Sequence, residues 1–261
     1  MSEADSRAAG GDLAGLGVLV TRPREQASPL CHAIEQAGGR PLRFPVIEIG
    51  PAPDPARVRA VITGLQAEDL LIFVSANAVH GLQRLAGSAW PPAGILAAVG
   101  RATARALRAA GCGGVIVPER GFTSEALLAT PALQRLRPRR VLILRGGRGR
   151  DLLARAWRAR GVLVEYLDVY SRRLPDTDGA RLQSWLARGE LDVVLVSSGE
   201  GLRNLLQLAG ASREALSSLP VVVPGERVAD EARRLGCGRV LQAADATDAA
   251  MLARLRTLAQ A

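Results

Sequence analysis

The chain has 261 residues, of which 34 are basic and 25 acidic, and its formal net charge is +9 at pH 7. Every basic residue is arginine, because the sequence contains no lysine, and this excludes Schiff-base enzymes and Walker-type phosphate loops, which need lysine. The length is sufficient for two domains that each bury a core, and an aromatic content of 3% argues against nucleic acid as a partner.

The first 17 residues lack the basic-then-apolar pattern of a signal peptide and are expected to form a flexible tail. No apolar run approaches the roughly 20 residues that span a bilayer, so no membrane segment is predicted. The three cysteines (Cys31, Cys112 and Cys237) lack metal-binding spacing and are expected to be buried in a cytoplasmic protein. With only two histidines, the sequence predicts neither a metal site nor a cofactor site.

The chain contains an internal repeat. Two long segments of its first half align on segments of its second half with an offset of 123 residues, and a third aligns after two inserted residues. Three matches in the same order indicate a duplication. Aligned pairs include Val18 with Val141, Asp69 with Asp192, Ser75 with Ser198, and Gly100 with Gly225.

Each repeat alternates apolar strands with amphipathic helices, the pattern of a parallel α/β sheet. Continuous apolar runs indicate strands that are covered on both faces. The helix after Arg145 is expected to begin near Asp151, whose carboxylate suits the positive helix end, and Trp157 is expected to lie in the core. The predicted strands are Val18–Val20, Leu70–Val74, Val141–Leu144, Val193–Val196 and Val221–Val223.

Polar and glycine-rich turns follow these strands. Ligands of parallel sheets bind at the carboxyl ends of the strands, and such turns offer backbone N–H groups to anions. The alternative that Ser75, Asn77 and Ser198 only cap the following helices stays open. A dinucleotide fingerprint beginning at Gly147 is incomplete, because Leu152 stands where its last glycine would be.

Six motifs in order, VLVTRPREQASPL, FVSANAV, AVGRATARALRAAG, LILRGGRGRDLL, LDVYSRR and VLVSSGEGLRNLL, resemble those of the uroporphyrinogen-III synthase family. The resemblance extends from Val18 to about Leu255. It implies an α/β fold of two Rossmann-like or flavodoxin-like parallel-sheet domains, joined by a two-stranded antiparallel linker. The implied boundaries are a tail at 1–17, domain 1 at 18–43 plus 175–261, domain 2 at 46–170, and linker strands at 44–51 and 167–175.

The resemblance also implies an activity. The family is a lyase that cyclises hydroxymethylbilane to uroporphyrinogen III, with inversion of the last ring and loss of water, in a cleft between two domains and without a cofactor. A chain rich in arginine suits a substrate that bears carboxylates on every pyrrole. The implied partners are this substrate and, transiently, hydroxymethylbilane synthase, and we expect a monomer.

Tyr170 matches the family position most often given a chemical role. The hypothesis for this chain is that it donates a proton to the departing hydroxyl, and packing alone is the alternative. One departure from the family pattern is that Val228 stands where the other repeat has Thr103. Glu226 lies nearby, and Arg227 is the candidate to offset its charge. The strand-end turns and the family positions together give the candidate substrate contacts, Arg22, Ser75, Asn77, Thr103, Arg145, Arg150, Ser197, Ser198 and Gly225.

Other functions remain open at this point, because fold does not fix function. The main alternative is a two-lobed binding or regulatory module that captures a polyanionic small metabolite without catalysis. A nucleotide-dependent enzyme is a second alternative, but the sequence has neither the lysine of a phosphate loop nor a complete dinucleotide fingerprint. A third is a nucleic-acid binder, whose affinity would fall steeply with salt concentration.

Overall fold

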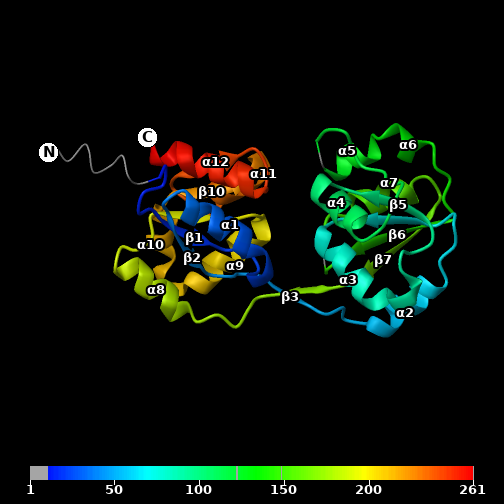
Figure 1. Cartoon of the computed structure of the whole chain (residues 1–261), viewed down its shortest axis with the longest axis horizontal. Coiled ribbons are helices and arrows are strands. Elements are labelled where there is room, and N and C mark those ends of the chain that lie inside the picture. Colours follow the sequence, from blue (N-terminus) through cyan, green and yellow to red (C-terminus); the bar gives the residue numbers. More distant parts are fainter. Residues whose placement is uncertain (1–10, 122, 148, 261) are drawn as a thin grey trace. The chain divides into compact units, whose positions relative to one another are not determined.

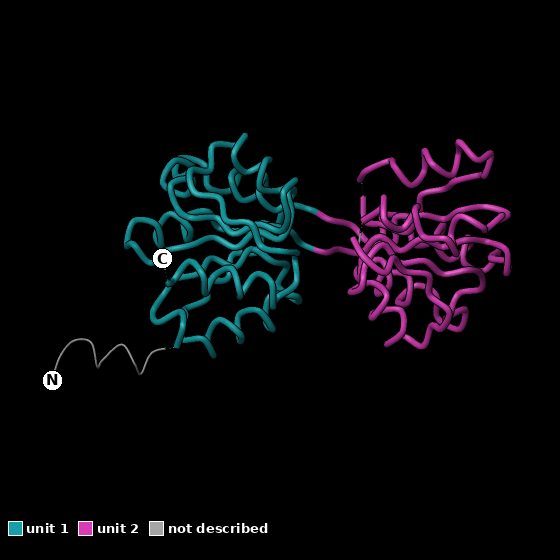
Figure 2. The backbone as a smooth tube through the Cα atoms, turned by 90° about the horizontal axis from the view of Figure 1, so that it is seen from above, with its two compact units in different colours: residues 1–48, 173–261 teal, residues 49–172 magenta. Residues whose placement is uncertain are grey.

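The computed structural model describes residues 11–121, 123–147 and 149–260, and the chain forms two compact units (Figures 1 and 2). Unit 1 consists of Met1–Glu48 and Arg173–Ala261, and unit 2 of Ile49–Arg172. The chain therefore leaves unit 1, completes unit 2 and returns to unit 1. Within the described residues no helix combines the length and apolar character that crossing a membrane requires.

Unit 1 is built on a five-stranded parallel sheet in the order β11-β10-β9-β1-β2. All four residues of β1 are buried, as expected for a central strand with helices on both faces. On one face, Leu30 of α1 and Met251 of α12 pack with Val18 and Val20. The strands are β1 Gly17–Val20, β2 Arg40–Arg43, β9 Val193–Leu195, β10 Val221–Pro224 and β11 Val240–Ala243; the helices are α1 Arg24–Gln36, α8 Gly179–Ala187, α9 Gly199–Ala209, η3 Gly210–Ser212, α10 Arg213–Ser218, α11 Gly225–Arg234 and α12 Asp248–Ala259.

Unit 2 contains a four-stranded parallel sheet in the order β5-β4-β6-β7. Beyond β5, Ile116 adds a single parallel bridge to Ala97. The strands are β4 Leu70–Phe73, β5 Ile95–Ala98, β6 Arg140–Arg145 and β7 Leu163–Asp168; the helices are α2 Pro55–Thr63, α3 Ala76–Ala86, η2 Gly87–Ala89, α4 Arg101–Ala109, α5 Ser124–Leu128, α6 Pro131–Gln134 and α7 Leu152–Arg158. Two parallel sheets confirm the predicted α/β fold class.

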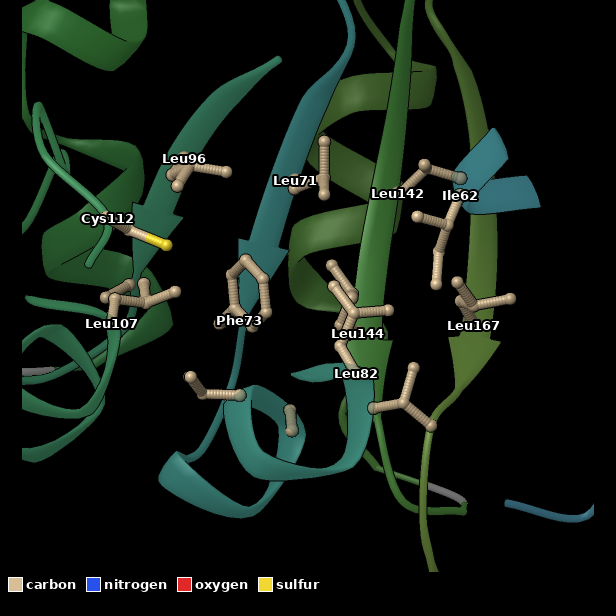
Figure 3. Close-up of a cluster of buried hydrophobic side chains, with 14 of the residues drawn as sticks. Ile62, Leu71, Phe73, Leu82, Leu96, Leu107, Cys112, Leu142, Leu144 and Leu167 are labelled. Atoms are coloured by element: carbon tan, nitrogen blue, oxygen red, sulfur yellow. The ribbon is translucent and has the colours of Figure 1, made fainter. Parts of the chain in front are cut away.

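Alternate residues of the unit 2 strands enter two different cores. Leu71 and Phe73 of β4 pack with Leu82 of α3 on one face (Figure 3). Leu70 of the same strand packs with Trp157 of α7 on the other face. The period of two is the geometry of a strand whose faces are both covered, and it confirms that Trp157, fully buried, belongs to the core.

The duplication is visible in both units. Helices α3 and α9 keep the 123-residue offset at both ends, and the glycine that follows each helix has nearly the same backbone angle, φ 52° at Gly87 and 51° at Gly210. By the same offset β1 and β2 correspond to β6 and β7, while β4 corresponds to β9. Because β1 and β9 share one sheet and β4 and β6 the other, each unit combines part of both repeats.

The expectation of a flexible tail over residues 1–17 is wrong for its second part. Leu13 is fully buried in the unit 1 core, its N–H donates to the carbonyl of Ala37 at 2.8 Å, and Gly15 N–H donates to the carbonyl of Gly38 at 2.9 Å. Leu13 provides the apolar area that holds this segment against the turn after α1. Residues 1–10 lie outside the described residues.

The segments predicted as linkers form a shorter two-stranded antiparallel sheet of β3 (Glu48–Gly50) and β8 (Ser171–Arg173). The flanking residues lie within the units, since Phe44 is fully buried in unit 1 and β7 continues to Asp168 in unit 2. The residues on either side of β3 and β8 pack into the cores of the units through their apolar side chains. The three cysteines are buried as predicted, and burial raises the pKa of each thiol.

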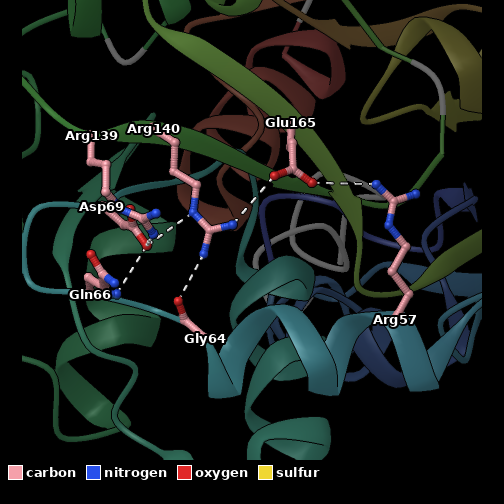
Figure 4. Close-up of polar contacts among 7 residues, drawn as sticks. All are labelled: Arg57, Gly64, Gln66, Asp69, Arg139, Arg140 and Glu165. Atoms are coloured by element: carbon pink, nitrogen blue, oxygen red, sulfur yellow. Dashed lines mark hydrogen bonds and ion pairs between the residues drawn. The ribbon is translucent and has the colours of Figure 1, made fainter.

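A buried carboxylate joins two strands of unit 2 at their amino ends (Figure 4). Asp69, fully buried just before β4, accepts two hydrogen bonds from Arg139, at 2.9 and 2.8 Å, and one from Arg140 at 3.1 Å. The N–H of Gln66 donates to it at 3.0 Å. Burial opposes ionisation of Asp69, but these donors outweigh it and lower the pKa of the carboxyl group.

Candidate active site

The hydroxyl group of Tyr170 lies at the centre of a polar cluster in unit 2. Tyr170 is fully buried, and its Oη lies 3.1 Å from Ser75 Oγ. Two groups of one guanidinium donate to the same Oη, Arg172 Nη2 at 2.8 Å and Arg172 Nε at 3.2 Å. The structure therefore brings together two predicted site residues, Ser75 and Tyr170, with an arginine that the sequence analysis did not select.

Close backbone packing fixes the position of the Tyr170 ring. A Cβ at Gly146 would lie 2.3 to 2.5 Å from three ring carbons, so this position has no room for a side chain. A Cβ at Gly81 of α3 would lie 2.4 Å from the carbonyl oxygen of Val169. Glycines at both positions let the turn after β6 and helix α3 approach the tyrosine.

Ser75 ends the loop after β4 and caps α3. Its Oγ accepts a hydrogen bond from the Ala78 N–H at 3.2 Å, so the expectation of a capping role is confirmed. Ser198 caps α9 in the same way, accepting from the Gly201 N–H at 3.1 Å. These caps leave other N–H groups of each first turn without helical partners, so capping and anion binding are compatible at both sites.

Arg145, at the end of β6, is held within unit 2. Its Nε lies 3.2 Å from Asp168 Oδ1, and its guanidinium stacks on Tyr166 at 3.5 Å from the ring centroid. The same Asp168 oxygen accepts from the Gly147 N–H at 3.1 Å. Arg145 and Asp168 therefore brace the glycine-rich turn.

Tyr166 extends this bracing to the start of α7. Its hydroxyl group donates to Asp151 Oδ1 at 2.9 Å, and Asp151 is the residue just before the helix, as expected. Burial raises the pKa of Tyr166, and the hydrogen bond to Asp151 adds to the rise. Tyr166 therefore connects β7 to the start of α7.

Two further predicted arginines are paired with nearby carboxylates. Arg150 lies 2.6 Å from Glu125, with both side chains 55% exposed, and the pKa of Glu125 is lowered by its own backbone N–H first and by Arg150 among other donors. Arg22, in unit 1, pairs with Asp248 and donates to the carbonyl oxygen of Ala246 at 2.7 Å. These carboxylates partly neutralise the arginines.

The remaining predicted residues lie at the helix starts after strands. Asn77 lies in the first turn of α3, Thr103 is buried in the first turn of α4, and Ser197 precedes the cap of α9. Gly225 begins α11 with a φ of 67°, which favours glycine. Val228 is buried and its side chain has no polar atom. Only the backbone groups of this position are available for binding.

Arg227 does not pair with Glu226, contrary to expectation. It lies 3.8 Å from Glu231, one helical turn further on, and Arg203 pairs with the same carboxylate. The spacing of four residues places Arg227 and Glu231 on one face of α11. Glu226 is exposed.

Glu231 packs against the first residue of α9. A Cβ at Gly199 would lie 2.1 Å from the Glu231 carboxylate. The corresponding positions in unit 2 are Ala76 and Ala106, by the two repeat offsets. Glycine therefore makes room for glutamate in unit 1, whereas the repeat has alanine at both corresponding positions in unit 2.

We expect Gly199→Ala to destabilise unit 1 by about 1 kcal/mol, the lower end of the cost of overpacking, because the methyl group overlaps the Glu231 carboxylate and forces it to move. The double variant Gly199→Ala/Glu231→Ala recreates the unit 2 pair and is expected to recover most of this loss, since exposed ion pairs are worth little. Urea unfolding of the wild type, both single variants and the double variant measures the coupling. Strict additivity of the two changes would contradict the packing argument.

The tyrosine cluster does not recur at the repeat-related positions of the described residues. The offset of 123 places Ile47 at the position of Tyr170 and Ile49 at that of Arg172. Only the serine cap recurs, as Ser198. This difference between the repeats is the signal in the sequence that would have selected Arg172, because a tyrosine and an arginine stand where the other repeat has two isoleucines.

The described residues contain no group of His, Cys, Asp and Glu side chains that could hold a metal ion. What the cluster offers is proton chemistry, since a phenol, a serine hydroxyl and a guanidinium are joined by hydrogen bonds. The surrounding helix N-termini add sites for anions. This combination suits a substrate that is an anion and loses a hydroxyl group.

Comparison with known proteins agrees with this chemistry. A family model described as "Uroporphyrinogen-III synthase HemD" matches residues 28–253. The chain is 33% identical over 247 residues to uroporphyrinogen-III synthase of Escherichia coli (strain K12), and 32% identical over 247 residues to that of Salmonella typhimurium, covering 92% of this chain and 100% of each relative. The crystal structure of a mutant uroporphyrinogen III synthase from Thermus thermophilus is similar with a TM-score of 0.62 at 25% identity, covering 93% of this chain and 98% of that one. Because the family model spans most of the chain and both relatives match over their whole length, the chain belongs to the uroporphyrinogen-III synthase family.

Proposed function

We propose that this protein cyclises hydroxymethylbilane to uroporphyrinogen III, with inversion of the last ring and loss of water, as a cofactor-independent hydro-lyase. The observation that carries the proposal is the match of the family over residues 28–253, in a chain whose unit 2 holds a tyrosine hydroxyl group between Ser75 and Arg172. The two together supply a substrate class and a group for proton transfer.

The substrate bears an acetate and a propionate on each pyrrole. We infer that the first turns of α3 and α4 in unit 2, and of α9 and α11 in unit 1, bind these carboxylates through backbone N–H groups and the positive helix ends. Ser75, Thr103, Ser198 and Gly225 lie at these four helix starts. Asn77 and Ser197 adjoin them, and both remain proposed contacts.

Arginines contribute in a second way. Arg145, Arg150 and Arg22 are each paired with a carboxylate of the protein. We infer that Arg145 acts mainly by fixing the turn at Gly147, whereas Arg150, which is more exposed, can exchange Glu125 for a substrate carboxylate. Arg22 remains a proposed substrate contact, and its positive charge attracts the substrate carboxylates.

The chemistry requires few side chains. Loss of the terminal hydroxyl group as water leaves an azafulvenium cation, which the substituted carbon of the last pyrrole attacks, and the spiro intermediate then fragments and closes in the inverted sense. Pyrrole nitrogens supply the electrons. The protein has to fix the folded conformer, exclude water and deliver a proton to the leaving hydroxyl, for which Tyr170 is the proposed source.

The isomer ratio of the product tests this function. Hydroxymethylbilane is generated from porphobilinogen by hydroxymethylbilane synthase, this protein is added, and the oxidised porphyrins are separated into type I and type III. We expect type III to dominate, whereas heat-inactivated protein should leave only type I, the uncatalysed product. Bilane binding with type I alone would instead favour a binding module without catalysis.

Three further expectations accompany this proposal and stay predictions. They are a transient hand-over of the bilane from hydroxymethylbilane synthase, a monomeric state and a cytoplasmic location. Light scattering during size-exclusion chromatography measures the monomeric state directly.

A further inference from the structure

The tyrosine that we propose as proton source lies behind another residue. Tyr170 is fully buried, whereas Ser75 is partly exposed at the start of α3. The two hydroxyl oxygens are 3.1 Å apart, which is hydrogen-bonding distance. A proton that leaves Tyr170 in this arrangement therefore passes first to Ser75.

The direction of the hydrogen bonds follows from the groups involved. Arginine has only donors, so both contacts of Arg172 with Tyr170 Oη, at 2.8 and 3.2 Å, use Tyr170 as acceptor. The Tyr170 proton is then available only for Ser75 Oγ. Ser75 Oγ also accepts from the Ala78 N–H at 3.2 Å, and with both lone pairs used its own proton points elsewhere.

Comparison of the two repeats shows that the fold does not require these hydrogen bonds. Unit 1 has the same serine cap at Ser198, but the 123-residue offset puts Ile47 and Ile49 at the positions that correspond to Tyr170 and Arg172. A helix after a parallel strand thus needs the serine but neither the tyrosine nor the arginine. The additional residues in unit 2 require a role other than capping.

We propose that Arg172, Tyr170 and Ser75 form a proton relay in which Ser75 is the catalytic residue that meets the leaving hydroxyl group, and Arg172 is a positioning residue. The inference rests on the proposed function. Ser75 gives its proton to the hydroxyl oxygen of the bilane, the C–O bond breaks with its electron pair leaving as water, and the pyrrole nitrogen supplies electrons to the carbon.

Ser75 then takes the proton of Tyr170, and the phenolate stays bonded to two N–H groups of Arg172. Hydrogen bonds to a charged oxygen are stronger than those to a neutral one, so Arg172 favours this state. The cyclised cation later releases one proton, which returns through Ser75 to Tyr170. The balance is one bilane consumed, and one uroporphyrinogen III and one water formed.

Arg172→Ala provides the test of the positioning role. We expect kcat to fall about 10- to 100-fold, the effect of one hydrogen bond to a charged group, with KM nearly unchanged. Millimolar guanidinium chloride should restore part of kcat in this variant, whereas sodium chloride should not. Arg173→Ala is the matched control, because Arg173 is the next residue of β8 and pairs with Glu48 on the surface.

Ser75 is tested with two variants that keep the helix cap. Asn caps helices as well as Ser does but has no acidic proton to transfer, whereas Thr keeps the hydroxyl group. We therefore expect Ser75→Asn to lower kcat at least 10-fold and Ser75→Thr, which keeps the hydroxyl group, to lower it less than Ser75→Asn does. Equal thermal stability of the two variants separates this effect from loss of the cap.

A measurement independent of activity uses the fact that the chain has two tyrosines. In a Tyr166→Phe background, protein labelled with [¹³Cζ]tyrosine gives one resonance, from Tyr170. We expect Arg172→Ala to move it and Arg173→Ala to leave it unchanged.

An unmoved resonance with unchanged kcat would overturn the relay, as would a rise in KM alone, which would make Arg172 a substrate contact. Absence of type III product from the wild type would refute the proposed function instead.

Discussion

Replacement of Tyr170 by Phe is expected to lower kcat for uroporphyrinogen III formation by about 100-fold, the lower end of what a general acid contributes. The ring of Phe fills the same space against Gly146, so packing is kept and only the hydroxyl group is lost. KM should change little, because Tyr170 is fully buried and does not bind the substrate carboxylates in our proposal. Steady-state and single-turnover kinetics distinguish loss of chemistry from slow product release.

The cost in stability should be small, about 1 kcal/mol, although the hydroxyl group makes three hydrogen-bond contacts, because both partners keep other ones. Arg172 is exposed and regains water, and Ser75 still caps α3 through Ala78. Tyr166→Phe is the matched control, since it removes the other tyrosine hydroxyl group of the chain, bonded to Asp151 at 2.9 Å, and keeps the ring on which Arg145 stacks. If both variants lost kcat equally, Tyr170 would have no special role.

The activity of the Tyr170→Phe variant also decides between a packing role and a chemical role for Tyr170. A packing role for Tyr170 was the alternative open from the sequence, and its complete burial fits that alternative as well as a role in proton transfer. What distinguishes the two is the hydroxyl group, which a packing tyrosine does not need. The Phe variant isolates this one atom.

Central strands were predictable because their sequences leave little choice. Runs such as Val221–Val223 are apolar throughout, and the structure places them as fully buried strands. The edge strands β2 and β11 were not predicted, since Arg40–Arg43 and Val240–Ala243 mix polar and apolar residues and are only partly buried. An edge strand is defined by its neighbour, which a single segment of sequence does not contain.

In the candidate site, too, local contacts were predictable and long-range contacts were not. The caps at Ser75 and Ser198 are local contacts, three residues long, and were predictable. The partner of Arg22 is 226 residues away at Asp248, and no spacing rule reaches that far. Tyr170 and Ser75, 95 residues apart, were selected separately from the family motifs, and only the fold reveals that they touch.

Arg172 could have been predicted as a site residue from the sequence. It lies in the quoted motif LDVYSRR, two residues after Tyr170, so on an extended strand both side chains lie on the same face. Comparison with Ile49 in the other repeat would have marked it. The contact itself depends on the path of the chain between Tyr170 and β8, which the motif does not determine.

Replacement of Asp69 by Asn is expected to destabilise unit 2 by about 3 kcal/mol at pH 7, a larger loss than that expected for Gly199→Ala or Tyr170→Phe. Asp69 is fully buried with hydrogen bonds from Arg139, Arg140 and the Gln66 N–H. Asn removes the negative charge that these arginines share and turns one oxygen into a donor group facing other donors. Because Arg139 is 45% exposed, water offsets part of the loss, which favours the lower end of the range for buried pairs.

Fluorescence can follow unit 2 alone. Trp90 and Trp157 belong to unit 2 and Trp185 to unit 1, so a Trp185→Phe background leaves tryptophan signals only in the unit that carries Asp69. Asp192→Asn is the matched control, since the repeat places Asp192 at the same position in unit 1. Asp192 is exposed and accepts a hydrogen bond from the Gly17 N–H at 2.6 Å. Its replacement should leave the fluorescence transition of unit 2 unchanged and cost unit 1 about 1 kcal/mol, which circular dichroism of the whole chain follows.

The dependence on pH follows from the lowered pKa of Asp69. A group whose pKa is lower in the folded state contributes its full stabilisation above its unfolded pKa and loses it as the pH falls through the folded one. The difference in unfolding free energy between wild type and Asp69→Asn should therefore be constant from about pH 5 to pH 8 and shrink below about pH 4. A difference that stayed constant down to pH 2 would show that the charge of Asp69 does not stabilise the fold, and that Asn disturbs only the packing around it.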